Sequence, residues 1–236
     1  MPPHSDQQAP DMTTDKTTDK TTDKKPAIEP QVAYLGLDWV NVKPYDSEAS
    51  WLLARRLALC STDAAGILGA SRYKSALTVY LDKIGEWPAG ETSAPAEWGK
   101  RLEGAIADAY AAKTGETLVD PGRWTLFISK PHSFLATSLD RLILPRAGQQ
   151  GPPSILEIKT AKTTSAWKAG VPLEYQIQIH HQFLVTGIRK ATVALLVAGS
   201  DYRTYQIEAN EKFMKLLLDR LSDFWQNHVI PKAIPK

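Results

Sequence analysis

The spacing of hydrophobic residues changes along the chain from a helical period to a strand period, and then alternates between the two. Four early segments have the helical pattern: 50–57, 62–69, 76–83 and 96–113. Three strand-like runs follow, at 124–129, 134–144 and 155–160. A helical segment at 173–186, two more strands at 192–198 and 202–208, and a final helix from the Asn210 cap to about residue 228 complete the pattern. This order predicts an α/β fold with a central mixed β-sheet flanked by helices.

Local signals indicate where several of these helices begin and end. Gly69, Gly115 and Gly187 each follow a helical pattern, as expected for a residue that ends a helix. Ser61 or Thr62 is the expected cap of the second helix.

The N-terminal segment lacks such periodicity. Thr-Thr-Asp-Lys occurs three times in succession, at 13–16, 17–20 and 21–24. A polar, repetitive segment of this kind buries too little apolar surface to fold, so residues 1–30 are expected to be disordered. The short apolar piece 32–40 is a candidate strand. We therefore divide the chain into a mostly disordered tail, 1–46, and one folded domain, 47–236.

Composition limits the kind of protein and the kind of metal site. The chain is 43% hydrophobic, which suffices for a packed core, and its net charge of +2 excludes no class of partner. It has one cysteine, Cys60, so we expect no internal disulfide and no Cys-rich zinc or iron–sulfur site. Any metal should be held by oxygen. Without a signal-peptide pattern or an apolar stretch of 18 residues, the sequence predicts a cytoplasmic protein with no membrane contact.

An acidic residue interrupts the apolar face of the strand predicted at 134–144. Alternation sets Asp140 on the same face as Phe134, Ala136, Ser138, Leu142 and Leu144. The connection 145–153 is rich in Gly and Pro and predicts a turn. If the flanking strands pair symmetrically about residues 148 and 149, Asp140 lies opposite Glu157, with Lys159 on the same face.

Two carboxylates and an ammonium on one strand face suit phosphodiester hydrolysis. The carboxylates can hold a hard cation, while the ammonium stabilises developing charge on the phosphate or lowers the pKa of the attacking water. The alternative for the triplet 157–159 is an ordinary solvated strand face. That alternative does not account for Asp140 among apolar neighbours.

Two further polar positions lie on predicted helices. Glu103 borders the buried stripe of segment 96–113; the alternative is an edge salt bridge with Lys100 or Arg101. Gln178 and Gln182 lie one turn apart on segment 173–186, which favours amide contacts to a water or a phosphate, with an exposed polar face as the alternative. The adjacent pair His180 and His181 points in two directions and does not favour zinc.

Four motifs together resemble the YqaJ-type viral recombinases, relatives of phage lambda exonuclease in the PD-(D/E)xK nuclease superfamily. They are WGKRLE at 98–103, SLD at 138–140, LEIK at 156–159 and QIHHQFLVTG at 178–187. The resemblance covers about residues 50–228. It implies a restriction-endonuclease-like core and a 5′→3′ exonuclease that degrades linear double-stranded DNA from its ends, for recombination by single-strand annealing. It also implies double-stranded DNA ends and a single-strand annealing protein as partners, and assembly of the chain into a homo-oligomeric ring trimer.

The resemblance assigns roles to individual residues. Glu103, Asp140, Glu157 and the backbone carbonyl of Ile158 would hold Mg²⁺, with Mn²⁺ as a substitute, and Lys159 would activate water or stabilise the transition state. Gln178 would orient the nucleophile. Arg55 and Thr62 would bind the 5′-phosphate, with Arg56 as a competitor for the first of these roles. Four positions depart from the usual family pattern. The acid at Asp140 commonly stands between Pro and Gly but here stands between Leu139 and Arg141. A glutamine is common in place of His180, and a serine in place of Thr62.

Other functions stay open at the level of the sequence. An endonuclease of the same superfamily could use the same metal site, and a catalytically idle DNA-binding module could retain the fold. A Cas4-like nuclease with an iron–sulfur cluster is disfavoured by the single cysteine.

Overall fold

The computed structural model describes residues 36–88 and 93–235. The repeats and the predicted disordered segment 1–30 lie outside the described residues, as do residues 32–35 of the candidate strand. The described helices are α2 (Glu48–Arg56), α3 (Ser61–Ile67), α4 (Ala76–Lys83), α5 (Ala94–Thr114), α6 (Leu173–Thr186) and α7 (Glu211–Phe224), with short 3₁₀ and π turns at Ser165–Trp167 (η1) and Trp225–Val229 (η2). None of these described helices is both long and apolar enough to cross a membrane.

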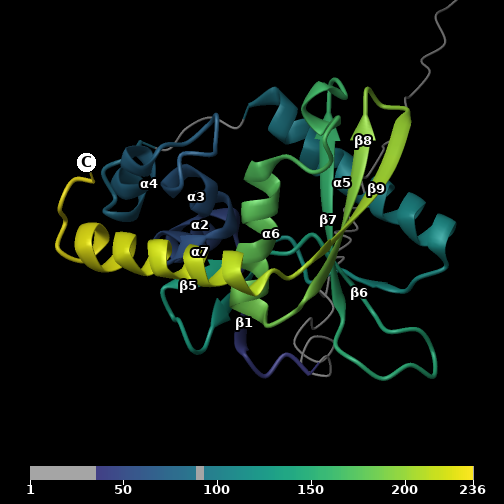
Figure 1. Ribbon diagram of the computed structural model, residues 1–236, viewed down its shortest axis with the longest axis horizontal. Coiled ribbons are helices and arrows are strands. Elements are labelled where there is room, and N and C mark those ends of the chain that lie inside the picture. The colour runs from purple at the N-terminus through teal and green to yellow at the C-terminus, as the bar shows by residue number, and fades with distance from the viewer. Residues whose placement is uncertain (1–35, 89–92, 236) are drawn as a thin grey trace, which may run out of the picture.

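Within the described residues, five strands form the larger sheet, in the order β3-β6-β7-β8-β9. They are β3 (Leu118–Val119), β6 (Arg141–Ile143), β7 (Ser154–Ala161), β8 (Lys190–Val197) and β9 (Asp201–Glu208). β7 and β8 run parallel, while the other neighbouring strands are antiparallel, so the sheet is mixed (Figure 1). The predicted fold class is therefore confirmed.

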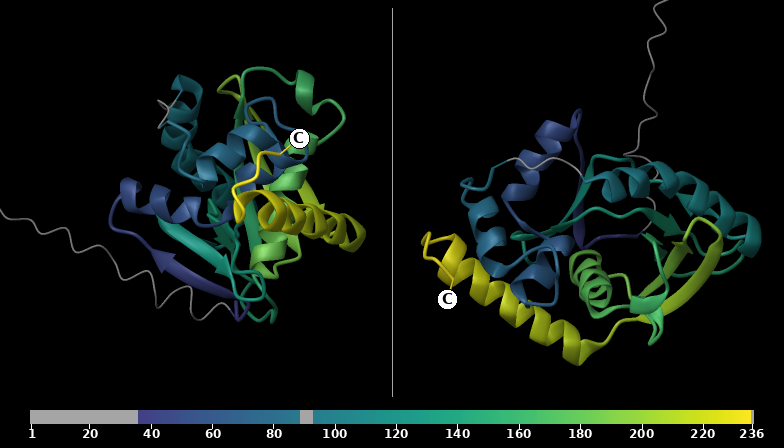
Figure 2. Two further views of the ribbon diagram at one scale, coloured as in Figure 1. Left: turned by 90° about the vertical axis from the view of Figure 1, so that its left-hand side faces the viewer. Right: turned by 90° about the horizontal axis from the view of Figure 1, so that it is seen from above.

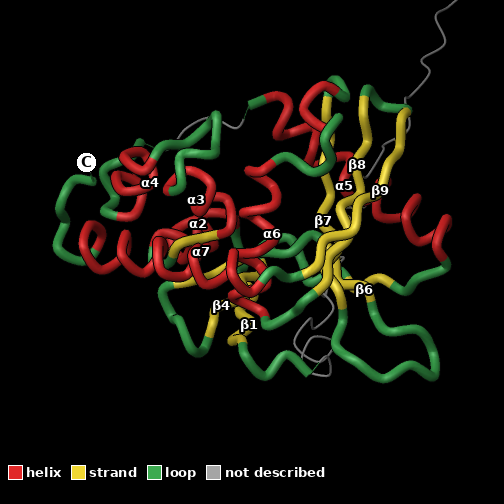
Figure 3. Tube along the Cα trace, in the orientation of Figure 1, coloured by secondary structure: helices red, strands yellow, loops and turns green. Residues whose placement is uncertain are grey.

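A smaller, separate sheet corrects the prediction of a single sheet. It has the order β1-β4-β5-β2 within the described chain. Figure 3 shows β1 and β4 apart from β7, β8 and β9 of the larger sheet. Its strands are β1 (Val40–Pro44), β2 (Leu59–Cys60), β4 (Thr125–Ser129) and β5 (Leu135–Thr137). β1 precedes residue 47 and pairs with β4 along its whole length, so the fold already includes residues that the sequence grouped with the tail.

The strand predicted at 134–144 is in fact two strands. Its first part is β5, which pairs with β4 and β2; its second part is β6, which pairs with β7 and β3. Residues 138–140 lie between them and connect the two sheets. Alternation of apolar residues continues through the break, so the pattern alone could not reveal it. The break ends at Asp140.

Helices cover both faces of the larger sheet (Figure 2). On one face, Ile106 and Tyr110 of α5 pack in a buried cluster with Leu156 and Ile158 of β7. On the other face, α6 contributes residues such as Phe183 to the main core, and α7 packs outside α6. β7 is thus covered on both sides, and its residues 155–158 are all buried, the charged Glu157 among them.

Helix ends follow the sequence signals with one exception. α5 and α6 end at Gly115 and Gly187, which adopt the left-handed conformation with φ of 69° and 72°. The side chain of Asn210 caps α7 by accepting a hydrogen bond from the backbone of Phe213 at 3.1 Å. The cap predicted for α3 is wrong: α3 starts at Ser61, and the carboxylate of Asp63 accepts a hydrogen bond from the backbone N–H of Cys60 at 2.9 Å.

Candidate active site

β7 presents two charged side chains to the α6 side of the larger sheet. Because side chains alternate along a strand, Leu156 and Ile158 face α5, while Glu157 and Lys159 share the opposite face. Glu157 is 2% exposed, and its carboxylate Oε1 forms an ion pair with the ammonium of Lys159. The predicted shared face of these two residues is confirmed.

Asp140 lies beside Glu157, as the symmetry of the turn predicted. β6 and β7 pair in the register Arg141↔Leu156 and Leu142↔Ile155, which extends to Asp140 opposite Glu157, one residue before β6 begins. Asp140 Oδ2 accepts a hydrogen bond from the backbone N–H of Ile158 at 2.7 Å. The Asp140 carboxylate therefore takes the place that a backbone carbonyl of a neighbouring strand would have beside Ile158.

The backbone carbonyl of Ile158 points toward the same edge. In a strand, the N–H and the C=O of one residue point to the same neighbour. Since the N–H of Ile158 reaches Asp140, its carbonyl also points past the end of β6 toward the acidic residues. This geometry agrees with the carbonyl ligand predicted there.

Two amides of α6 hold the carboxylate of Glu157. Gln178 Nε2 donates to Oε1 at 2.5 Å, and Gln182 Nε2 donates to Oε2 at 2.7 Å. We expected these amides to contact a water or a phosphate; in the structure they orient Glu157. The family resemblance assigns a role only to Gln178, and the spacing of one turn is the signal that also indicated Gln182.

Glu103 reaches the site from α5, on the opposite side of the sheet. Its carboxylate accepts from Arg141 Nη1 at 2.6 Å. The alternative partners expected from the sequence are engaged elsewhere: Lys100 pairs with Glu48 at 3.2 Å, and Arg101 pairs with Glu97 at 2.6 Å. Glu103 thus has an ion pair, but with the residue that follows Asp140 rather than with a neighbour on its own helix.

Burial and like charges determine the protonation of the site. Burial, and then the negative charges of Glu157 and Glu103, raise the pKa of Asp140 well above its usual range, against the opposing effect of Lys159. Burial disfavours the charged form of Lys159, but Glu157 and Asp140 outweigh it and raise the pKa of the ammonium. The raised pKa keeps Lys159 protonated and positively charged at neutral pH.

The donor atoms suit a hard divalent cation. Asp140, Glu157 and the Ile158 carbonyl offer oxygen atoms beside β7, just before β6 begins. A cation there would relieve the unfavourable proximity of the two carboxylates. In the described part of the chain, no three His, Cys, Asp or Glu side chains are arranged so that they could hold a metal together. Glu103 would become a third carboxylate ligand only after leaving Arg141.

Tyr175 supports Lys159 from α6. The Lys159 Nζ lies 5.0 Å from the centroid of the Tyr175 ring, and that ring stacks on Trp167 with centroids 5.4 Å apart. His181, in contrast, is buried, and its Nε2 lies 3.1 Å from the backbone oxygen of Leu59. Tyr175 therefore lies beside Lys159, whereas His181 belongs to the core.

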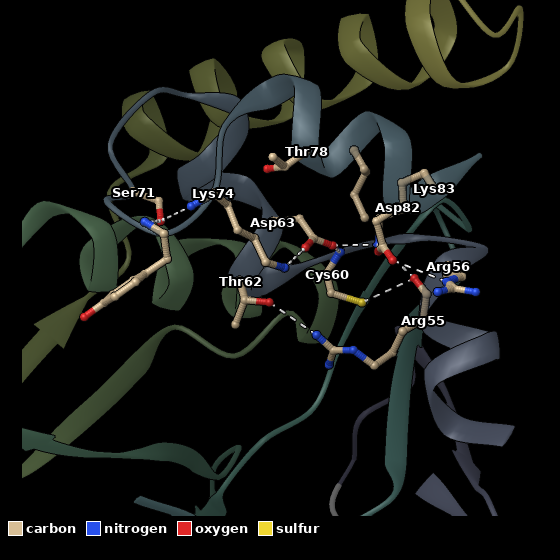
Figure 4. Close-up of polar contacts among 12 residues, drawn as sticks. Arg55, Arg56, Cys60, Thr62, Asp63, Ser71, Lys74, Thr78, Asp82 and Lys83 are labelled. Atoms are coloured by element: carbon tan, nitrogen blue, oxygen red, sulfur yellow. Dashed lines mark hydrogen bonds and ion pairs between the residues drawn. The ribbon is translucent and has the colours of Figure 1, made fainter. Parts of the chain in front are cut away.

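The two predicted phosphate ligands are in contact with each other. Arg55 Nη2 donates to Thr62 Oγ1 at 3.2 Å (Figure 4), and the guanidinium of Arg55 lies 4.5 Å from the ring centroid of Trp51. Trp51 Nε1 in turn donates to Ser138 Oγ at 3.2 Å, two residues before Asp140. The competitor Arg56 instead pairs with Asp82 at 3.3 Å.

Comparisons with known proteins identify the family. Residues 50–189 match the YqaJ-like viral recombinase domain. The chain is 28% identical over 196 residues to the protein YqaJ of Bacillus subtilis (strain 168); the match covers 80% of this chain and 59% of that relative, so the chain spans less than two thirds of its length.

Solved structures share the fold. An alkaline exonuclease, LHK-Exo, from Laribacter hongkongensis superposes with a TM-score of 0.63 at 20% identity, and its complex with dAMP superposes with a TM-score of 0.61 at 18% identity. Both matches cover 78% of this chain and 94% of the other. Together with the match to the family model, which spans more than half of the sequence, this confirms the resemblance inferred from the four motifs: the chain belongs to the family of the YqaJ-like viral recombinase domain.

Proposed function

We propose that the protein is a metal-dependent deoxyribonuclease that degrades linear double-stranded DNA from its ends in the 5′→3′ direction, for homologous recombination by single-strand annealing. The observation that carries the proposal is the meeting of Asp140, Glu157 and Lys159 beside β7, just before β6 begins. Membership of a viral recombinase family and a fold shared with an alkaline exonuclease support it. That exonuclease binds dAMP, a nucleoside monophosphate of the kind that stepwise digestion of DNA releases.

Mg²⁺ is the proposed cofactor, and Mn²⁺ is its expected substitute. Asp140, Glu157 and the Ile158 carbonyl would hold it, with Glu103 as an additional ligand. When bound, such an ion neutralises charge on the phosphate and lowers the pKa of bound water.

The chain's own residues supply positioning and charge. The Lys159 ammonium, held between Glu157 and the Tyr175 ring, stabilises negative charge that develops on the scissile phosphate. Gln178 and Gln182 fix the orientation of Glu157, so that its carboxylate keeps one geometry during turnover. Arg55 and Thr62 receive the 5′-phosphate at the end of the duplex, which confines cutting to ends.

Cooperation with a single-strand annealing protein and assembly into a ring trimer, both implied by the family resemblance, complete the proposal. Action in the cytoplasm, which was expected from the sequence, also belongs to it. An endonuclease of the same superfamily is the main alternative, because the same metal site serves either mode of cutting. A catalytically idle DNA-binding module is the other.

Substrate topology tests the proposal. We expect the purified protein to degrade linear 5′-phosphorylated duplex in Mg²⁺, to stop when a chelator is added and to spare covalently closed circles. Cutting of closed circles would indicate the endonuclease. Absence of cutting in Mg²⁺ and in Mn²⁺, with DNA binding intact, would indicate the idle module.

Glu103→Gln should weaken metal binding without removing the site. The amide keeps a hydrogen bond to Arg141 but loses the negative charge that would attract a cation. We therefore expect the Mg²⁺ concentration for half-maximal activity to rise about 10-fold or more. A titration of the cutting rate with Mg²⁺ measures this shift. An unchanged Mg²⁺ dependence would limit Glu103 to its ion pair with Arg141.

A further inference from the structure

Asp63 is a buried carboxylate that the proposed chemistry does not use. It is 2% exposed, at the start of α3, and it contacts two lysines on opposite sides. Lys83 Nζ lies 2.7 Å from Oδ2, and Lys74 Nζ lies 2.7 Å from Oδ1. The side chain of Lys83 is itself only 1% exposed. A lysine and an aspartate buried together call for an explanation, because removing both charges from water is costly.

The pair connects the two elements that carry the candidate phosphate ligands. Lys83 Nζ donates to the backbone oxygen of Arg55 at 3.0 Å, at the end of α2. Asp63 Oδ2 accepts from the backbone N–H of Cys60 at 2.9 Å, where the chain enters α3 and leads to Thr62. In Figure 4 the pair is drawn above the contact between the Arg55 guanidinium and the Thr62 hydroxyl. One buried ion pair therefore fixes the backbone on both sides of that contact.

The local charge balance favours an anion. Among the described residues of this cluster, Arg55, Arg56, Lys74 and Lys83 are cationic, while the carboxylates are Asp63 and Asp82. Burial alone would raise the pKa of Asp63, but Lys83, Lys74 and Arg55 together lower it below its usual range, so Asp63 stays charged. Of these cations, Arg55 contacts the Thr62 hydroxyl directly. A phosphate group has the charge and the acceptor atoms that such a cluster recognises.

We infer that Asp63 and Lys83 are positioning residues, which hold Arg55 and Thr62 as a preformed receptor for the terminal phosphate of a DNA strand. The inference rests on the proposed function, in which Arg55 and Thr62 contact that phosphate. The buried pair touches no DNA. Its contribution is to fix α2 and α3 relative to each other before substrate binds, which lowers the entropic cost of recognition.

The test removes both charges at once. Replacing one partner would leave the other buried and unpaired, which strongly destabilises a protein, whereas removing both is often tolerated. The double variant Asp63→Asn with Lys83→Met keeps the approximate side-chain sizes and removes the ion pair. The readout is the ratio of the degradation rates of 5′-phosphorylated and 5′-hydroxyl linear duplex. Because one protein sample cuts both substrates, partial unfolding cancels from this ratio.

We expect the double variant to lower the wild-type preference for the 5′-phosphate about 10- to 100-fold, as a displacement of about 1 Å in a binding group can do. Asp63→Glu keeps the charge but shifts both lysine contacts, and we expect an intermediate decrease. The matched control is Lys215→Met with Asp219→Asn, which removes an exposed Lys–Asp pair of the same length, 2.7 Å, on α7. It should keep the wild-type ratio.

Arg55→Ala separates failure of this inference from failure of the proposed anchor. If Arg55→Ala abolishes the preference while the double variant and Asp63→Glu keep it, the positioning role is wrong and the anchor stands. If Arg55→Ala also keeps the preference, Arg55 is no phosphate anchor, and the inference falls with it while the nuclease activity of the wild type stands.

Discussion

Lys159→Met should reduce the rate of DNA degradation about 10²- to 10³-fold, the usual effect of removing one group that stabilises charge in a transition state. Lys159 is held as an ammonium by Glu157 and Asp140 and lies against the Tyr175 ring, so its charge is fixed before substrate binds. Methionine has a similar length and no charge. The initial rate on 5′-phosphorylated linear duplex at saturating Mg²⁺ measures the effect.

Folding of the Lys159→Met variant is checked by its melting temperature, and binding by its affinity for duplex in the presence of a chelator. A matched control is Lys190→Met, on the neighbouring strand β8, which removes an exposed lysine paired with Glu208 at 3.3 Å. The control should degrade DNA at the wild-type rate. A Lys159→Met variant that cuts as fast as the control would refute the assignment of Lys159.

Local sequence features sufficed to predict the acidic hairpin. The register of β6 and β7 follows from the Gly- and Pro-rich connection at 145–153 together with a side-chain period of two. These two facts set Asp140 beside Glu157 and set Lys159 on the same face as Glu157. The ends of α5 and α6 were predictable for the same reason, since Gly115 and Gly187 act on their own helices.

Contacts between distant segments were not predictable in this way. Alternation runs unbroken through residues 138–140, so only the pairing of β5 and β6 with different sheets reveals the break. Glu103 could choose among several cations, and the one it contacts, Arg141, is brought near by the packing of α5 on the sheet. Likewise, the ends of α2 and α4 meet only in the folded chain, where Lys83 reaches the backbone of Arg55.

Asp140→Asn should reduce the rate of metal-dependent cutting about 10²-fold or more, and yet make the metal-free protein more stable at neutral pH. The asparagine side-chain oxygen can still accept the hydrogen bond from Ile158, so the hairpin geometry is kept. What disappears is a buried carboxyl group whose ionisation beside Glu157 is unfavourable. The wild-type protein keeps this group at a cost in folding free energy, which is the usual trade between stability and activity at a functional site.

The pH dependence has a definite sign. Burial and Glu157 raise the folded-state pKa of Asp140 above the ordinary value of 3.8, so the folded protein holds this proton more tightly than the unfolded chain does. Wild-type stability therefore falls as the pH rises from about 3.8 through the raised folded-state pKa, whereas the asparagine variant lacks this loss. Melting temperatures of both proteins in chelator, from acid to neutral pH, should diverge in favour of the variant. Parallel curves would contradict the expected effect of the carboxylate.

Adding Mg²⁺ should reverse this order. A cation that binds only the folded state stabilises it by about 2.7 kcal/mol at 100 times its Kd, and the wild type alone retains both facing carboxylates. We therefore expect the melting temperature of the wild type to rise with Mg²⁺ and that of Asp140→Asn to stay nearly constant. A Mg²⁺ shift of equal size in both proteins would exclude Asp140 as a ligand. If the order of the two melting temperatures reverses on addition of Mg²⁺, the same Asp140 carboxylate destabilises the metal-free protein and binds the metal.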